Sequence, residues 1–158
     1  MIRDATNADE AEIREIVYSV LDEYGLSPDP DGTDADLADL EGNYWKSAGV
    51  FHVVLSDDGA LVGCAGLLRL SSAEAEVRKM YLLPAARGRG LGRLLLERLV
   101  ADARRLGYRS LVLETASVLG EAIALYRSAG FSPVSPDHLS ARCDQAWKLV
   151  LSAGEGGR

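Results

Sequence analysis

The spacing of apolar residues in the first part of the chain predicts one amphipathic helix. Apolar side chains recur there every three or four residues, which places them on a single helical face. Thr6 or Asn7 supplies a cap before this helix, and Gly25 ends it. The apolar positions are Ile13, Ile16, Val17, Val20, Leu21 and Tyr24.

Short apolar runs between turn residues predict strands in the remainder of the chain. Two of these runs flank Asp57-Asp58-Gly59, which indicates a β-hairpin. We expect strands over 2–5, 50–55, 61–70, 74–83, 111–114, 131–134 and 145–151, a loop over 26–33, a short acidic helix over 34–40, and helices over 91–106 and 119–129. This order predicts an α/β protein in which a mixed sheet is flanked by helices. We expect one domain over 1–151 and a polar, glycine-rich tail over 152–158.

The longest predicted helix has a leucine-rich apolar face. Its apolar positions are 91, 94, 95, 99, 103 and 106, and Gly107 follows its last turn. The predicted strand over 74–83 lies just before this helix and is followed by Pro84. Between the two lies a loop in which glycine and arginine alternate.

This loop has the composition of a phosphate-binding site. It reads Arg87-Gly88-Arg89-Gly90-Leu91-Gly92-Arg93. Glycines allow the backbone to approach a bulky ligand, and the amides at the start of the following helix attract anions. The loop lacks the Lys and Ser/Thr of a Walker loop, and its third glycine is misplaced for a dinucleotide fingerprint. The sequence therefore predicts a site for another polyphosphorylated ligand.

The loop resembles the acetyl-CoA signature of the GNAT N-acetyltransferase superfamily, Arg/Gln-x-x-Gly-x-Gly/Ala. The match is Arg87-x-x-Gly90-x-Gly92, between a strand and a helix as in that family. A second match lies in the helix over 119–129, where Tyr126 is followed by Gly130 and Phe131. The resemblance implies a GNAT fold, with a mostly antiparallel sheet of six to seven strands and about four helices.

Composition places the chain among ordinary globular proteins. It has 158 residues, of which 47% are hydrophobic and 26% charged. No apolar stretch is long enough for a membrane span, and the first residues do not resemble a signal peptide. Cys64 and Cys143 have no metal or redox spacing. We therefore expect a cytoplasmic protein without a metal or a membrane partner.

The net charge of −7 argues against a nucleic-acid partner, but the charge is unevenly distributed. Residues 78–109 hold nine Lys and Arg against two acids, whereas residues 1–41 hold thirteen acids against two Arg. A basic segment in an acidic chain would attract a polyanion such as CoA. Part of it, at Arg98, Arg104 and Arg105, has the spacing of a solvated helix face.

The resemblance also assigns roles to individual residues. It implies that the strand before the loop pairs with the pantetheine arm through the backbone of Met80, Tyr81 and Leu82, where an amide faces the thioester oxygen. In the family, the Tyr corresponding to Tyr126 commonly donates a proton to the CoA sulfur, although Tyr126 also has a packing position. Glu76 is the candidate general base. The phosphate contacts would come from Arg87, Gly88, Arg89, Gly90, Leu91, Gly92 and Arg93.

Other candidates are weaker. Glu114 and Glu41 are further carboxylates for the base, and solvent alone is an alternative. Tyr44 and Trp45 either line the acceptor pocket or pack in the core. His52 and Cys64 lie in neighbouring predicted strands, but nothing else suggests a nucleophilic pair. Where relatives often carry an Asn that contacts CoA, this chain has Leu119.

The resemblance therefore implies an acetyl-CoA-dependent N-acetyltransferase that uses direct transfer in a ternary complex. The first choice of acceptor is a small-molecule amine or a free amino acid. The alternatives are acetylation of a protein lysine or N-terminal amine, and a non-catalytic acyl-CoA sensor. A nucleotide-binding protein is a third class, for which the loop lacks the magnesium-binding parts. The oligomeric state is left open, a homodimer included.

Overall fold

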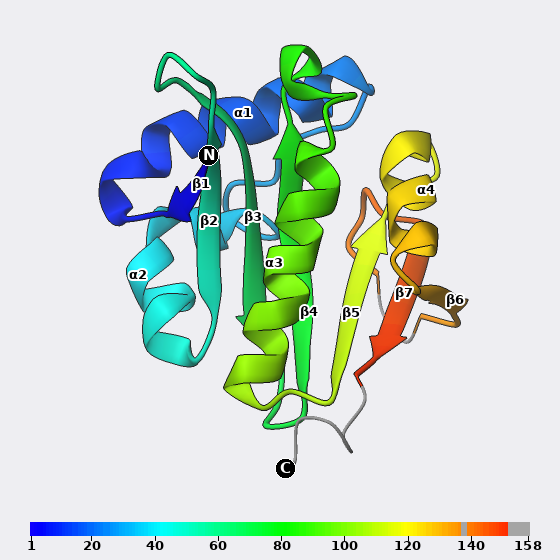
Figure 1. Ribbon diagram of the computed structural model, residues 1–158. Coiled ribbons are helices and arrows are strands. Elements are labelled where there is room, and N and C mark those ends of the chain that lie inside the picture. The colour runs from blue at the N-terminus through cyan, green and yellow to red at the C-terminus, as the bar shows by residue number, and fades with distance from the viewer. Residues whose placement is uncertain (137–138, 152–158) are drawn as a thin grey trace.

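The computed structural model describes residues 1–136 and 139–151, and their strands form one seven-stranded sheet (Figure 1). The strand order is β1-β2-β3-β4-β5-β7-β6, and every neighbouring pair except β4 and β5 is antiparallel. The strands are β1 (Ile2–Asp4), β2 (Val50–Leu55), β3 (Leu61–Arg69), β4 (Glu74–Leu82), β5 (Ser110–Thr115), β6 (Ser132–Val134) and β7 (Gln145–Val150). This confirms the predicted mixed, mostly antiparallel sheet.

Helices cover both faces of the sheet, and each face has its own apolar core (Figure 1). The helices are α1 (Glu10–Glu23), α2 (Leu40–Asn43), α3 (Leu91–Leu106) and α4 (Gly120–Ser128). The first core joins α3 and α4 to the sheet through residues such as Leu95, Leu99 and Tyr126. The second joins α1 and α2 to the other face through Ile13, Val17 and Leu40.

Most predicted elements are found with small changes at their ends. The helix predicted over 91–106 has the observed bounds of α3, and Gly107 follows it at φ +90°. Thr6 caps a short 3₁₀ turn that leads into α1. The predicted acidic helix is instead divided into a 3₁₀ turn over Ala35–Ala38 and α2, because Asp39 between them has an extended ψ of 86°. The predicted tail at 152–158 lies outside the described residues.

The prediction that Leu94 belongs to the apolar face of α3 is wrong. Leu94 is 53% exposed, whereas Leu96, which was not placed on that face, is 1% exposed. Leu96 lies three residues before Leu99 and seven before Ala103, so it continues their stripe. Leu94 lies three and four residues before Glu97 and Arg98, on the solvated side. No helix among the described residues is long and apolar enough to cross a membrane.

The sheet opens between its two parallel strands. β4 and β5 pair only at their starts, from Glu74 opposite Ser110 to Glu76 opposite Val112. Beyond these positions the ladder ends, and β5 continues its pairing with β7 on its other side. The carboxyl-terminal half of β4 therefore has an unpaired edge that faces the gap. The loop before α3 follows directly from this half of β4.

Candidate active site

A cavity of about 590 Å³ occupies the opening between β4 and β5. Its walls come from both strands, from the glycine-rich loop, from α4 and from the segment that precedes β7. The wall contains Gly88, Gly90, Gly92 and Arg93 of the loop together with Glu76, Arg78 and Glu114 from the strands. A single cavity thus brings together a predicted phosphate site and several ionisable side chains.

The glycine-rich loop forms an open approach to the start of α3. Gly88 and Gly90 have φ values of +77° and +79°, which favour glycine, and a Cβ at either position would meet no atom within 4 Å. Gly90 is also the N-cap of α3 and offers no side chain to the first helical amides. At Gly92 a Cβ would lie 3.2 Å from Leu125 Cδ2 on α4. The backbone here can therefore approach a large anion, at the positive end of a sixteen-residue helix.

The arginines of the loop differ in what they contact. Arg87 donates to both carboxylate oxygens of Glu23, at 2.7 and 2.8 Å, and to the Leu82 carbonyl at 3.1 Å. This ion pair holds the loop against the end of α1, and Arg87 also lines the cavity. Arg93 donates to Ser128 Oγ at 3.2 Å and lines the cavity. Arg89 is exposed and lies outside the cavity wall, and Leu91 packs against the α3 core.

β4 contains an irregularity that the sequence does not predict. Its register with β3 shifts between the pairs Cys64–Tyr81 and Gly66–Arg78, and Lys79 has a φ of +56°. An extra residue of this kind is a β-bulge, which rotates the following residues about the strand. Lys79 is therefore turned away from the core that Val77 joins, and Met80 and Leu82 pack against that core instead. Because neither Gly nor Asn occupies the position, the sequence carries no signal for this bulge.

Met80, Tyr81 and Leu82 line the cavity along the unpaired edge of β4. The structure places their backbone where an added strand would pair, since β5 has already separated. Burial raises the pKa of Tyr81 to about 12, so its hydroxyl stays protonated at neutral pH. The assignment of these residues to the pantetheine arm stays a prediction.

Tyr126 comes from the last turns of α4 and is 6% exposed. Its ring lies 6.0 Å from that of Phe131, centre to centre, and belongs to the α3 and α4 core. The residue also lines the cavity, and its hydroxyl donates to no acceptor among residues 1–136 and 139–151. Burial raises the pKa of this hydroxyl well above its usual value. Tyr126 therefore combines a packing position with a protonated hydroxyl that has no partner within the described protein.

Glu76 and Glu114 lie on the same face of the two diverging strands. Glu76 is registered with Val112, two residues before Glu114 on β5, and side chains two residues apart share a face. Burial raises the pKa of Glu76, the Glu114 charge raises it further, and the Arg78 charge opposes both effects. Glu114 accepts a hydrogen bond from the Ser140 amide at 2.9 Å. A raised pKa brings the Glu76 carboxylate closer to what a general base requires near neutral pH.

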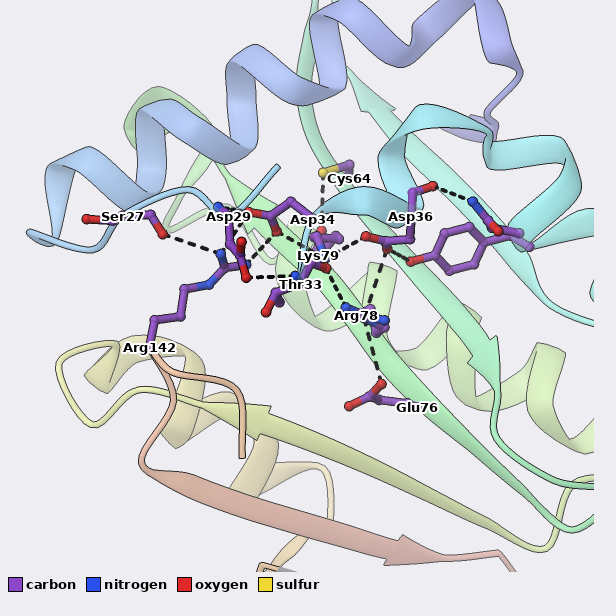
Figure 2. Close-up of polar contacts among 12 residues, drawn as sticks. Ser27, Asp29, Thr33, Asp34, Asp36, Cys64, Glu76, Arg78, Lys79 and Arg142 are labelled. Carbon is purple, nitrogen blue, oxygen red and sulfur yellow. Dashed lines mark hydrogen bonds and ion pairs between the residues drawn. The ribbon is translucent and has the colours of Figure 1, made fainter. Parts of the chain in front are cut away.

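A network of largely buried charges borders Glu76 (Figure 2). Asp34, whose side chain is 0% exposed, accepts two hydrogen bonds from Arg142 at 2.7 and 2.8 Å and lies 3.2 Å from Lys79 Nζ. Lys79 Nζ also lies 3.0 Å from Asp36 Oδ1 and donates to the Thr33 carbonyl at 2.9 Å. Three segments distant in sequence are thereby joined: 29–36, the bulge in β4, and the segment before β7.

The charges in this network shift the pKa of Asp34. Burial by itself raises the pKa of this carboxyl, but the hydrogen bonds from Arg142 and the Asp29 amide, together with the Lys79 charge, lower it to about 2. Asp36 in turn accepts a hydrogen bond from the buried hydroxyl of Tyr44. Asp34 is thus ionised at neutral pH, and the contacts of the network fix one wall of the cavity.

Three of the weaker candidates, Tyr44, Trp45 and Glu41, lie outside the cavity wall. Tyr44 is buried in the α1 core, and the Trp45 indole donates to the Ala5 carbonyl at 3.0 Å, so both pack rather than line the cavity. Glu41 accepts from the Asn7 amide and is also outside the cavity wall. Leu119, at the position where relatives often carry Asn, lines the cavity with an apolar side chain.

The suggested pair of His52 and Cys64 does not form. His52 is registered with Ala65, whereas Cys64 is registered with Val53, so the two side chains project from opposite faces. His52 Nε2 lies 2.6 Å from Asp102 of α3, and Cys64 donates to the Lys79 carbonyl on the other side. Among the described residues, no three His, Cys, Asp or Glu side chains are arranged to hold a metal ion. The expected absence of a metal remains a prediction.

Comparison with known proteins agrees with this architecture. The model of the acetyltransferase (GNAT) family matches residues 14–131. An uncharacterized N-acetyltransferase of Escherichia coli, YjgM, is 36% identical over 139 residues, which are 85% of this chain and 83% of that protein.

Solved structures share the fold. A GNAT-family acetyltransferase from Staphylococcus aureus superposes with a TM-score of 0.90 at 22% identity, covering 96% of this chain and 99% of the other. The structure of yncA from Salmonella typhimurium, an acetyltransferase solved with acetyl-CoA, has a TM-score of 0.74 at 28% identity, with 96% and 94% covered.

Proposed function

Because this chain belongs to the GNAT acetyltransferase family, we propose that it transfers the acetyl group of acetyl-CoA to the primary amine of a small molecule or free amino acid. The chain is a GNAT-type N-acetyltransferase, and the proposal concerns its acceptor, its site residues and its mechanism. The observation that carries it is the single cavity between β4 and β5, which joins a glycine-rich helix start to a pair of carboxylates.

The residues of the loop fit the phosphates of acetyl-CoA. Gly88 and Gly90 leave open space where side chains would otherwise stand, and the amides that begin α3 are not capped by a side chain. Anions bind at such helix starts through amide hydrogen bonds and the helix dipole. Arg93 adds a positive charge on the cavity wall, while Arg87 holds the loop in place through Glu23.

The thioester of acetyl-CoA supplies an acetyl group on a sulfur leaving group. We place its arm along Met80, Tyr81 and Leu82, because this edge of β4 has no strand partner beyond Glu76. The bulge at Lys79 sets the direction of the backbone amides that follow it. An amide fixed in this way can donate to the developing oxyanion. The acceptor then enters on the side of Glu76 and Glu114, so that both substrates are bound when transfer takes place.

Glu76 and Tyr126 are the residues that we assign to the proton transfers of the reaction. Glu76 accepts a proton from the ammonium group of the acceptor, which frees the nitrogen lone pair. As the nitrogen–carbon bond forms and the carbon–sulfur bond breaks, Tyr126 donates its hydroxyl proton to the sulfur. The second proton lost by the nitrogen replaces the one that Tyr126 has given. The products are the acetylated amine, the CoA thiol and one proton carried by Glu76.

The proposal is tested by incubating the protein with acetyl-CoA and a panel of primary amines, amino acids and short peptides. Release of free CoA thiol is followed together with the mass of the acetylated product. We expect thiol release that depends on a small amine or an amino acid. Turnover confined to peptide or protein amines would favour the alternative acceptors, and binding of acetyl-CoA without any turnover would favour a sensor.

A further inference from the structure

Among the cations that border the carboxylates of the cavity, Arg78 differs in how its charge is used. Lys79 and Arg142 are held by the aspartates, Lys79 between Asp34 and Asp36 and Arg142 by two bonds to Asp34 (Figure 2). Arg78 donates one hydrogen bond, from Nη2 to the Thr33 carbonyl at 2.6 Å, and its Nη1 donates to none of the described residues. Its side chain is 21% exposed and lines the cavity.

The acids near Arg78 leave most of its donors unused. Arg78 Nε lies 3.7 Å from Glu76 Oε1 and 4.0 Å from Asp36 Oδ2, which are ion-pair distances but too long for hydrogen bonds. A guanidinium has five N–H donors in a planar fork that matches a carboxylate. Arg78 can therefore bind an additional carboxylate without giving up the contacts seen here.

A ligand whose anionic group binds Arg78 must also carry a cationic group. Glu76 lies beside Arg78, and Glu114 lies on the same face of the next strand, so a simple anion would meet two further negative charges. Conversely, Glu76 accepts no hydrogen bond from the described residues, and Glu114 accepts one. These carboxylates are acceptors for an ammonium group. The cavity thus offers opposite charges a few ångströms apart.

We propose that the acceptor is an α-amino acid whose carboxylate binds Arg78 and whose ammonium group lies between Glu76 and Glu114. This inference rests on the proposed acetyl transfer and names its substrate class. In an α-amino acid one carbon carries both charged groups, so they lie close together. This closeness suits a site in which Arg78 Nε and Glu76 Oε1 are 3.7 Å apart. A simple amine fills only the acidic half of this arrangement. The ammonium placed at Glu76 is also the group that loses its proton to this residue before transfer.

The test compares each common L-amino acid with its decarboxylated amine and its carboxamide, for example leucine with isoamylamine and leucinamide. Loss of hydrogen bonds to a charged group corresponds to about 10- to 100-fold in kcat/KM. We expect the wild type to favour the amino acid over its amine by at least about 30-fold. In Arg78→Gln this ratio should fall toward one, while the Kd of acetyl-CoA, measured by calorimetry, stays within a few-fold of the wild type.

Arg78→Lys provides a second variant if Arg78→Gln does not fold, since it keeps the charge but not the planar fork. It should lower the ratio of amino acid to amine as well. Arg104→Gln on the exposed side of α3 is the matched control and should keep the wild-type ratio. A wild type that acetylates the amine as well as the amino acid overturns this inference and leaves acetyl transfer intact. A preference that survives in both Arg78 variants, or that falls equally in Arg104→Gln, overturns the assignment to Arg78. No acetylation of any amine contradicts the proposed function itself.

Discussion

At the scale of single residues, three side chains on the cavity wall carry the proposed chemistry: Tyr126, Glu76 and Arg78. The family resemblance gives catalytic roles to Tyr126 and Glu76, and these roles stay predictions. Arg78, to which we assign the acceptor carboxylate, receives no such role from the sequence, because there it is only one of the cations counted in the basic segment over 78–109. The position of the Arg78 side chain depends on contacts with Asp36 and Thr33. These two residues lie far from Arg78 in the sequence, so no local sequence pattern indicates the contacts.

Tyr126→Phe separates catalysis from packing. The ring and its contact with Phe131 remain, and only the hydroxyl is lost. If the hydroxyl protonates the sulfur, kcat should fall by about 100-fold, with acetyl-CoA affinity and unfolding temperature unchanged. The measurement is turnover at saturating acetyl-CoA with an acceptor found in the panel. Equal turnover in wild type and Tyr126→Phe would remove Tyr126 from the mechanism and leave it a packing role.

At the scale of elements, regular structure followed from the sequence, and the irregularities that shape the site did not. The bounds of α3 and the hairpin between β2 and β3 come from local spacing and glycine positions. The bulge at Lys79 is imposed by tertiary contacts, because a lysine at φ +56° is unfavourable by itself and is held by buried carboxylates. Asp34, which binds both Lys79 and Arg142, is the central member of this arrangement.

The lowered pKa of Asp34 gives a stability prediction with a definite sign. A carboxyl with a pKa of about 2 when folded and 3.8 when unfolded contributes about 2 kcal/mol to the free energy of unfolding at neutral pH. This contribution is present above pH 3.8 and is lost as the pH falls toward 2. Asp34→Asn should therefore lower the free energy of unfolding at pH 7 by at least about 2 kcal/mol, because Lys79 and Arg142 also lose a buried partner.

The measurement is urea unfolding of wild type and Asp34→Asn from pH 7 down to pH 3. The difference in unfolding free energy between them should narrow as the pH drops below about 4. Asp31→Asn, in the exposed part of the same loop, is the control and should match the wild type throughout. An Asp34→Asn protein as stable as the wild type at pH 7 would show that the network contributes nothing to the fold.

At the scale of the whole molecule, the acidic first third and the basic segment neutralise each other in part. Acids from residues 1–41 hold Arg87, Lys79 and Arg142, through Glu23, Asp34 and Asp36. The uneven charge seen in the sequence therefore fixes loops around the cavity, in addition to any attraction of a polyanion. The fold class and the order of elements along the chain could be predicted because each strand and helix has its own local pattern. These cross-chain pairings could not, because their partners are far apart in sequence.

The mechanism and the acceptor assignment both depend on acetyl-CoA occupying the cavity with its phosphates at the glycine-rich loop. Gly90→Glu places a negative side chain at this position. Gly59→Glu, in the hairpin between β2 and β3, is a matched control, since Gly59 also has a positive φ, of +88°, and open space around it. The backbone strain of the two substitutions is thus comparable, and only one lies at the proposed phosphate site.

The decisive measurement is the Kd of acetyl-CoA by isothermal titration calorimetry for the wild type and these two variants. We expect the wild type and Gly59→Glu to bind acetyl-CoA alike, and folded Gly90→Glu to show no measurable binding. Unchanged affinity in folded Gly90→Glu, or an equal loss in Gly59→Glu, would contradict the placement of acetyl-CoA in this cavity.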